Sequence, residues 1–147
     1  MKKLIVLALV ALSFTNSYAQ NATDLTSDKL ENAVIYEVNI RQYSPEGSFN
    51  AFTKDIPNLK QLGVKVIWIM PIFPISQTKR KATGGDNSKF ASEMPAAEQH
   101  KYLGSYYAVS DFKKVNPEFG TLEDFRKLVS TAHQSGMYVI LDWVPNH

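Results

Sequence analysis

The pattern of apolar and polar residues predicts three strands separated by two long helices. Short runs rich in apolar and β-branched residues occur at 34–40, 64–70 and 137–143, as expected for strands. Between them, apolar residues recur three and four positions apart at 49–62 and again at 122–132, which is the spacing of one helix face. The order strand, helix, strand, helix, strand implies parallel strands joined by right-handed crossovers.

The sequence also indicates where both helices end. Gly63 and Gly136 each stand between a helical pattern and the next strand, where a helix C-cap favours a residue that tolerates positive φ. Thr121 followed by Asp124 resembles a capping box, with Asp in place of the usual Glu or Gln, and predicts the start of the second helix. Pro57 lies inside the first helical pattern, so we expect it to kink that helix or to mark its true start.

The run at 64–70 is apolar at nearly every position, which is typical of a strand in a parallel sheet covered on both faces. Two α/β architectures fit, an open doubly wound sheet and a closed eight-stranded barrel. The first strand is followed by Arg41-Gln42-Tyr43-Ser44 and not by a glycine-rich phosphate loop, which disfavours a nucleotide-binding sheet. Residues 75–104 are polar and lack apolar periodicity, so we expect a long loop beyond the strand ends, which suits the barrel.

Residues 1–19 have the features of a secretory signal peptide. Two lysines precede an uninterrupted apolar run of nine residues at 4–12, and Ser17-Tyr18-Ala19 supplies small residues for cleavage. A membrane span needs about 20 apolar residues, so we expect no stable span after cleavage and an exported protein that is periplasmic, surface-bound or extracellular. Residues 20–147 then carry 14 basic and 14 acidic residues, a balance that gives no reason to expect nucleic-acid binding.

Candidate functional residues cluster after the third predicted strand, where ligands bind in α/β proteins. Asp142, Asn146 and His147 bring together a carboxylate, a carboxamide and an imidazole. They fit a hydrogen-bonding cradle for a polyol, a metal site such as calcium, or part of an acid–base system. Tyr107 offers an aromatic face to a sugar ring. Structural roles stay open as well, with Asp142 as a strand-end cap and Asn146 as a turn residue.

Four segments, in order and with matching spacing, resemble the α-amylase family of glycoside hydrolases, family 13. Residues 34–43 resemble its first barrel strand and residues 63–74 its second. Residues 107–121 are similar to the linker that precedes its next helix, and Asp142-x-x-x-Asn146-His147 resembles the motif ending its third strand. The resemblance covers residues 33–147 and implies the N-terminal portion, about three βα units, of a TIM (β/α)8 barrel.

The resemblance also implies roles for four residues. His147 is similar to a residue that bonds a glucose hydroxyl at the cleavage subsite, and Tyr107 resembles an aromatic residue that stacks on the same sugar. Asp142 resembles a buried carboxylate that supports the catalytic cluster and contacts substrate without being the nucleophile. Asn146 resembles a calcium ligand found in many members of the family.

The implied reaction is retaining hydrolysis or transfer on α-1,4-glucans such as starch, glycogen or maltooligosaccharides. It requires a carboxylate nucleophile and a carboxylic acid, which in the family follow strands four and five, with a further Asp after strand seven. We therefore expect residues 20–147 to be a truncated N-terminal part of the barrel, inactive by itself, with no indication of its oligomeric state. The alternatives are a non-catalytic glucan-binding protein, a degraded gene product, or a hydrolase of other glycosides.

Overall fold

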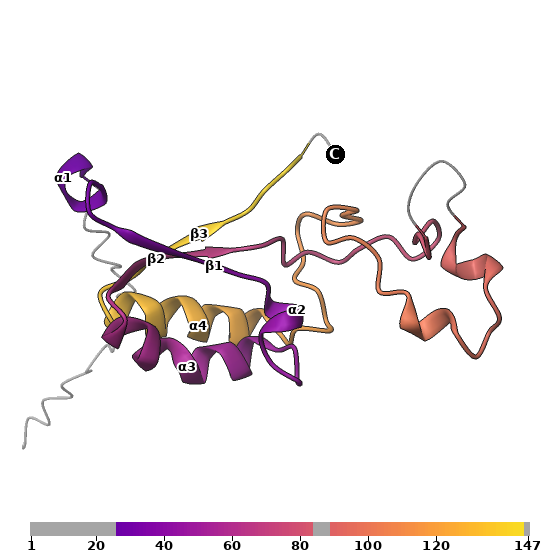
Figure 1. The fold of residues 1–147 in the computed structure, drawn as a ribbon, viewed down its shortest axis with the longest axis horizontal. Coiled ribbons are helices and arrows are strands. Elements are labelled where there is room, and N and C mark those ends of the chain that lie inside the picture. The colour runs from indigo at the N-terminus through magenta and orange to yellow at the C-terminus, as the bar shows by residue number, and fades with distance from the viewer. Residues whose placement is uncertain (1–25, 84–88, 146–147) are drawn as a thin grey trace, which may run out of the picture.

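A parallel three-stranded sheet forms the centre of the computed structural model, which describes residues 26–83 and 89–145 (Figure 1). The strands pair in the order β1-β2-β3. They span Val34–Val38 for β1, Val64–Ile69 for β2 and Tyr138–Leu141 for β3. Both pairings are parallel, which confirms the α/β class and the strand–helix–strand order predicted from the sequence.

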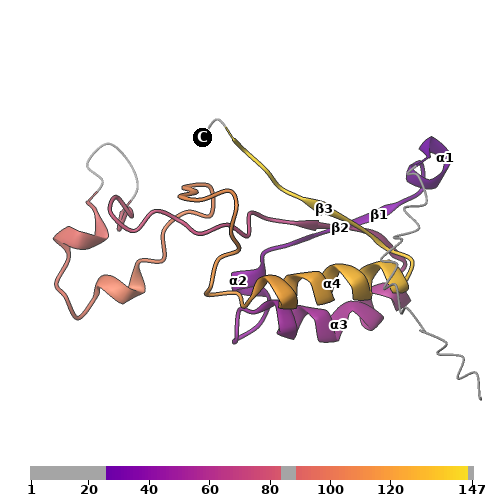
Figure 2. The same cartoon turned by 180° about the vertical axis from the view of Figure 1, so that it is seen from behind.

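Two long helices connect the strands and lie together on one face of the sheet, as both views show (Figures 1 and 2). Helix α3, Phe49–Gln61, joins β1 to β2, and helix α4, Leu122–Gln134, joins β2 to β3. Two single turns, α1 at Ser27–Leu30 and α2 at Ile40–Tyr43, flank β1. The segment between β2 and α4 contains only the short 3-10 turns η1 and η2 among its described residues, at Ala91–Glu93 and Gln99–Lys101.

The core lies between the sheet and these two helices. Ile67 and Ile69 of β2 are fully buried against α3 and α4. The helices contribute the buried side chains Phe49, Phe52, Ile56, Leu59, Leu128 and Ala132. Each large apolar side chain that is removed from water in this way contributes about 1.5–3 kcal/mol to folding. This layer holds the three strands in register and so fixes where their ends lie.

No helix among the described residues covers the opposite face of the sheet, and several of its side chains are exposed, although Val66 between them is buried. Trp68 pairs with Ile140 of β3 and with Glu37 of β1, so these three side chains share the face away from the helices. Ile35, Trp68 and Ile140 are 55%, 40% and 44% exposed. The expected cover on both faces is therefore not provided by the described residues. The reason is that the strand order advances in one direction, so successive right-handed crossovers place both helices on one side.

Two local expectations were wrong in detail, and one of the two alternatives for Pro57 is excluded. The first strand ends at Val38, because Ile40 already belongs to the turn of α2. Helix α3 begins at Phe49, with the Ser48 hydroxyl accepting from the amide of Ala51 at 3.2 Å, so Pro57 lies within the helix and does not start it. Leu62 follows the last helical residue and is 72% exposed, so it does not join the apolar face.

Both glycines predicted to end the helices adopt positive φ. The φ angles are 83° at Gly63 and 77° at Gly136. A Cβ atom at either position would meet no atom within 4 Å. The requirement for glycine is therefore one of backbone conformation and not of space.

The predicted capping box at the start of α4 is confirmed. The amide of Asp124 donates to the Thr121 hydroxyl at 3.1 Å, and the amide of Thr121 donates to Asp124 Oδ2 at 2.8 Å. Asn50 of α3 donates to Asp124 Oδ1 at 2.7 Å and so ties the two helices together. The side-chain and backbone hydrogen bonds from Thr121, followed by the bond from Asn50, lower the pKa of Asp124 below its ordinary value.

Replacing Thr121 with Val should raise the pKa of Asp124 towards its ordinary value, because the hydroxyl donor is lost. A carboxyl group with a lowered folded-state pKa stabilises the fold above its unfolded-state pKa, and this contribution is lost as the pH falls through the folded-state pKa. The first turn of α4 should therefore fray at a higher pH in Thr121→Val. The carboxyl 13C shift of Asp124 measures the titration.

The control for this experiment is Thr131→Val. The Thr131 hydroxyl donates at 2.8 Å to the carbonyl of Lys127 within the same helix and has no contact with Asp124. It should leave the titration of Asp124 unchanged. Equal titration curves for Thr121→Val and the parent protein would refute the capping account.

Candidate functional site

The polar segment between β2 and α4 extends beyond the carboxyl ends of all three strands (Figure 1). This is the edge of a parallel α/β sheet at which ligands bind. Two predicted site residues, Tyr107 and Asp142, lie here. Tyr107 belongs to the polar segment and Asp142 directly follows β3.

The backbone around Tyr107 is held against the end of β2. Ile75 and Val109 form an antiparallel bridge. On one side of this bridge the amide of Ser110 donates to the carbonyl of Pro74 at 2.8 Å, and on the other the amide of Ser76 donates to Ala108 at 2.8 Å. The residue that follows Tyr107 is therefore fixed to the chain that leaves the sheet.

Asp142 is held just as firmly from the other direction. Its amide donates to the carbonyl of Ile69 at 2.9 Å and so continues the β2–β3 ladder by one residue. The hydroxyl of Tyr107 donates to Asp142 Oδ2 at 3.0 Å. Two predicted site residues that lie 35 positions apart in the sequence thus meet at the ends of adjacent strands.

The electrostatics of this pair follow from that hydrogen bond. The pKa of Tyr107 is raised above its ordinary value, first by the hydrogen bond to Asp142, then by burial and then by the negative charges of Asp142 and Glu37. Each effect favours the protonated phenol, because ionisation would place a second negative charge beside a carboxylate. Tyr107 therefore stays a hydrogen-bond donor at neutral pH.

Glu37 was missed as a site residue. It lies in β1 on the open face of the sheet, opposite Trp68, and its charge acts on Tyr107. A signal was present in the sequence, since Glu37 is the one charged residue in the run of strand-forming residues at 34–40. Its importance depends on which face it occupies, and the register of β1 with β2 decides that.

The other two predicted site residues, Asn146 and His147, lie outside the described residues. Within residues 26–83 and 89–145, no group of three or more His, Asp and Glu side chains is arranged to hold a metal ion. The predicted calcium site therefore rests on Asn146 alone. Residues 1–19, the predicted signal peptide, are likewise outside the described part, in which no helix is long and apolar enough to cross a membrane.

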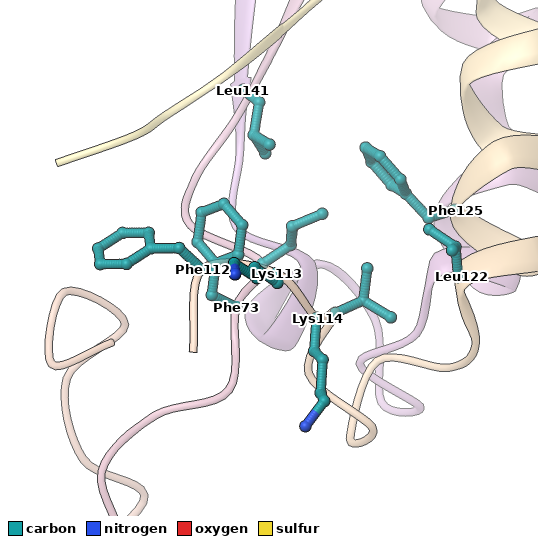
Figure 3. A pocket seen from close by; sticks show the side chains of 9 residues that line it. Phe73, Phe112, Lys113, Lys114, Leu122, Phe125 and Leu141 are labelled. Atoms are coloured by element: carbon teal, nitrogen blue, oxygen red, sulfur yellow. The ribbon is translucent and has the colours of Figure 1, made fainter. Parts of the chain in front are cut away.

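A separate hollow of about 410 Å³ lies close to the end of β3 (Figure 3). Leu141 stands on one side of it and Phe125 of α4 on the other, with Phe73 and Phe112 nearby. Leu141 contacts the core on the helix side of the sheet, whereas Asp142 is the next residue along the chain and points into the polar site. The hollow is thus an opening between sheet and helix, and it is distinct from the Tyr107–Asp142 pair.

Comparison with known proteins gives a family to this arrangement. The family model of the alpha-amylase catalytic domain matches residues 9–147. The chain belongs to the alpha-amylase family. It is 36% identical over 101 residues to alpha-amylase SusG of Bacteroides thetaiotaomicron and 28% identical over 152 residues to an alpha-glucosidase of Apis mellifera. Its fold is similar to that of an alpha-amylase from Lactobacillus plantarum, with a TM-score of 0.64 and 40% sequence identity.

This alpha-amylase family chain is much shorter than the proteins it resembles. The matches cover 69%, 100% and 79% of the chain for SusG, the alpha-glucosidase and the Lactobacillus plantarum enzyme. They cover only 11%, 22% and 23% of those proteins. The described sheet and site therefore correspond to a small part of each relative.

Asp142→Asn should lower the pKa of Tyr107 towards the ordinary tyrosine value of about 10, because the neighbouring negative charge disappears. Since the pKa of Tyr107 is raised, its hydrogen bond stabilises the fold fully below the unfolded-state pKa, and this contribution fades as the pH rises through the folded-state pKa. Glu37→Gln should produce a shift in the same direction but smaller, since its charge is the last of the causes. Site-specific NMR of a labelled Tyr107 ring measures both shifts, and a larger effect from Glu37→Gln would contradict this ranking.

Proposed function

We propose that this chain forms the N-terminal part of the catalytic barrel of a glycoside hydrolase that acts on α-1,4-glucans with retention of configuration. The observation that carries the proposal is the Tyr107–Asp142 pair at the carboxyl edge of the parallel sheet. The chain's membership of the alpha-amylase family supports the reaction class. In this proposal the chain supplies contacts to substrate, and the residues that break the glycosidic bond lie outside it.

The chemistry of the pair suits a sugar. The ring of Tyr107 offers an apolar surface for the C–H face of a pyranose, while its hydroxyl is directed to Asp142. The second oxygen of the Asp142 carboxylate can accept from a sugar hydroxyl, because Tyr107 uses only Oδ2. A charged acceptor makes shorter and stronger hydrogen bonds than a neutral one. The pair therefore combines stacking with one directed hydrogen bond.

His147 and Asn146 complete the proposed site through their places in the chain. They follow Asp142 by five and four residues, and the position of Asp142 is fixed by the β2–β3 ladder. We propose that His147 bonds a hydroxyl of the same sugar and that Asn146 offers its carbonyl to calcium. An amide oxygen is a ligand type that calcium accepts. No step of the proposed reaction depends on the metal.

Retaining hydrolysis needs a nucleophilic carboxylate and an acid about 5–5.5 Å apart, on either side of the scissile bond. In our proposal Asp142 orients the sugar and supports that cluster, and it attacks no bond. Tyr107 stays protonated beside Asp142 and so cannot serve as a base at neutral pH. The nucleophile and the acid would come from later strands of the barrel.

Two structural features support the barrel. The strand order does not reverse within the described sheet, whereas doubly wound sheets bind their ligands where it does. The face that carries Ile35, Trp68 and Ile140 is open to solvent, and a closed barrel would turn it inward and fill it with side chains. The hollow beside Leu141 would be covered in the same way by the next helix. We further propose that residues 1–19 direct export to the periplasm, the cell surface or the medium.

The full-length protein should release reducing sugars from starch and maltoheptaose with retention at the anomeric carbon, which NMR of the first products reports. Tyr107→Ala should weaken the affinity for maltoheptaose about tenfold, equivalent to about 1.4 kcal/mol, because the stacking surface is lost. Tyr102→Ala, in the same polar segment, is the control and should bind normally. Binding without any hydrolysis by the parent protein would favour a non-catalytic glucan-binding protein, and absence of both would refute the proposal.

The isolated 147-residue chain should bind an apolar dye such as anilinonaphthalene sulfonate, because the open face and the hollow expose apolar surface. Among the described residues, no strand pairs with the outer edge of β1 or of β3, so unfolding of the chain should be broad. Dye fluorescence and a thermal melt followed by circular dichroism test this, with the full-length protein as the reference. A sharp melt without dye binding would show that the chain is a complete domain by itself.

A further inference from the structure

Arg41 carries a charged side chain that is almost fully buried, and it is not one of the predicted site residues. It lies in α2, directly after β1, and its side chain is only 11% exposed. Burying a guanidinium group is costly unless its donors find acceptors and its charge is compensated. The contacts of Arg41 therefore indicate what it organises.

On one side, Arg41 contacts the segment that leads to Tyr107. Its Nη1 donates to the carbonyl of Gly104 at 3.2 Å. Its guanidinium carbon lies 4.5 Å from the centre of the Tyr106 ring, within the range of a cation–π interaction. Tyr106 immediately precedes Tyr107. The guanidinium thus holds the two ends of a three-residue stretch on the N-terminal side of Tyr107.

On the other side, Arg41 contacts the chain that leads into α4. Its Nη2 lies 3.5 Å from Glu118 Oε2, and the ring centre of Phe119 is 6.0 Å from the guanidinium carbon. Phe119 is buried in the core and packs against Phe49 with ring centres 5.9 Å apart. Arg41 therefore contacts the core-anchored chain before α4 and the polar segment at the same time.

We propose that Arg41 is a positioning residue that holds Gly104–Tyr106 against the fold, so that the Tyr107 hydroxyl reaches Asp142. Tyr107 is then held from both sides, by Arg41 before it and by the Ile75–Val109 bridge after it. This inference rests on the proposed function, in which Tyr107 stacks on the sugar. The contacts of Arg41 with Gly104, Tyr106 and Glu118 act on Tyr107 through the backbone that precedes it.

Lysine cannot replace arginine fully in this role. The planar guanidinium donates in two directions at once and stacks on an aromatic ring, whereas an ammonium group is a compact point charge. Lysine at this position keeps the charge, yet it cannot bond Gly104 and Glu118 while covering Tyr106 in the same geometry. The Arg41→Lys variant thus separates geometry from charge.

The test places 3-fluorotyrosine at position 107 of the full-length protein and follows its ionisation by 19F NMR. In the parent protein the residue should titrate above free 3-fluorotyrosine, as long as its hydroxyl bonds Asp142. In Arg41→Met the titration should move down towards that of the free amino acid, and in Arg41→Lys it should lie between the two. The affinity for maltoheptaose should fall in parallel, by about tenfold or more in Arg41→Met, because misplacing a contact group is costly.

The matched control is Arg126→Met, since Arg126 is an exposed arginine of α4 that pairs with exposed Glu123 at 3.6 Å. It should leave both readouts unchanged. A folded Arg41→Met protein that keeps the parent titration would overturn the inference. Should Arg41→Met fail to fold, Arg41→Lys decides alone, and an unchanged titration in that variant overturns it equally. If the parent protein binds no glucan while the 19F shifts follow the expected order, the proposed function fails and the positioning role stands.

Discussion

The parallel pairing of three strands is the constraint on which the rest of this structure depends. Parallel strands end at the same edge of a sheet, so Val38, Ile69 and Leu141 stop close together although the chain between them is long. Two backbone bonds carry the ladder past the strands, from Met70 to Val38 and from Asp142 to Ile69, each at 2.9 Å. The sheet therefore fixes the position of Asp142 in the site. The sheet in turn keeps its register because the apolar faces of α3 and α4 close over one side of it.

The edge of the sheet does not by itself position a residue in a loop, so Tyr107 needs further contacts to reach Asp142. Residues 76–115, which carry Tyr107, contain only the turns η1 and η2 as regular structure, and among those described only Ala91 is a buried apolar residue, so this part of the polar segment cannot be held by packing as the helices are. Directional contacts replace packing here. A β-bridge fixes the chain after Tyr107, and a buried guanidinium fixes the chain before it. The hydrogen bond between Tyr107 and Asp142 then joins loop to strand.

Local sequence signals predicted what local forces determine. Apolar spacing located α3 and α4, and Gly63, Gly136 and the pair Thr121–Asp124 marked helix ends, because caps and periodicity act within a few residues. Long-range relations were less accessible. The family resemblance implied that Tyr107 and Asp142 belong to one substrate site, but the bond between them depends on a loop path that no periodicity encodes. Arg41 was visible only as part of a family-like segment, since its role arises from Gly104, Tyr106 and Glu118, all more than sixty positions away. Leu62 was wrongly expected on the apolar face of α3, because an apolar residue at helical spacing need not belong to the helix.

The two faces of the sheet are stabilised differently, and Glu37 is the charged residue of β1 on the face away from the helices. On the helix side the side chains of the core are apolar and buried, so the hydrophobic effect stabilises this layer. On the open side a carboxylate stands among Ile35, Trp68 and Ile140. Were this face enclosed in the barrel that we propose, Glu37 would lose water, and an unpaired buried carboxylate is too costly for a stable fold. Closure would thus require polar partners near the strand ends, which is where Tyr107 and the proposed substrate site lie. Glu37 lies one residue before the end of β1, so the polar part of such a barrel's interior would have to be at the carboxyl edge of the sheet. This is the edge at which Tyr107 and Asp142 meet.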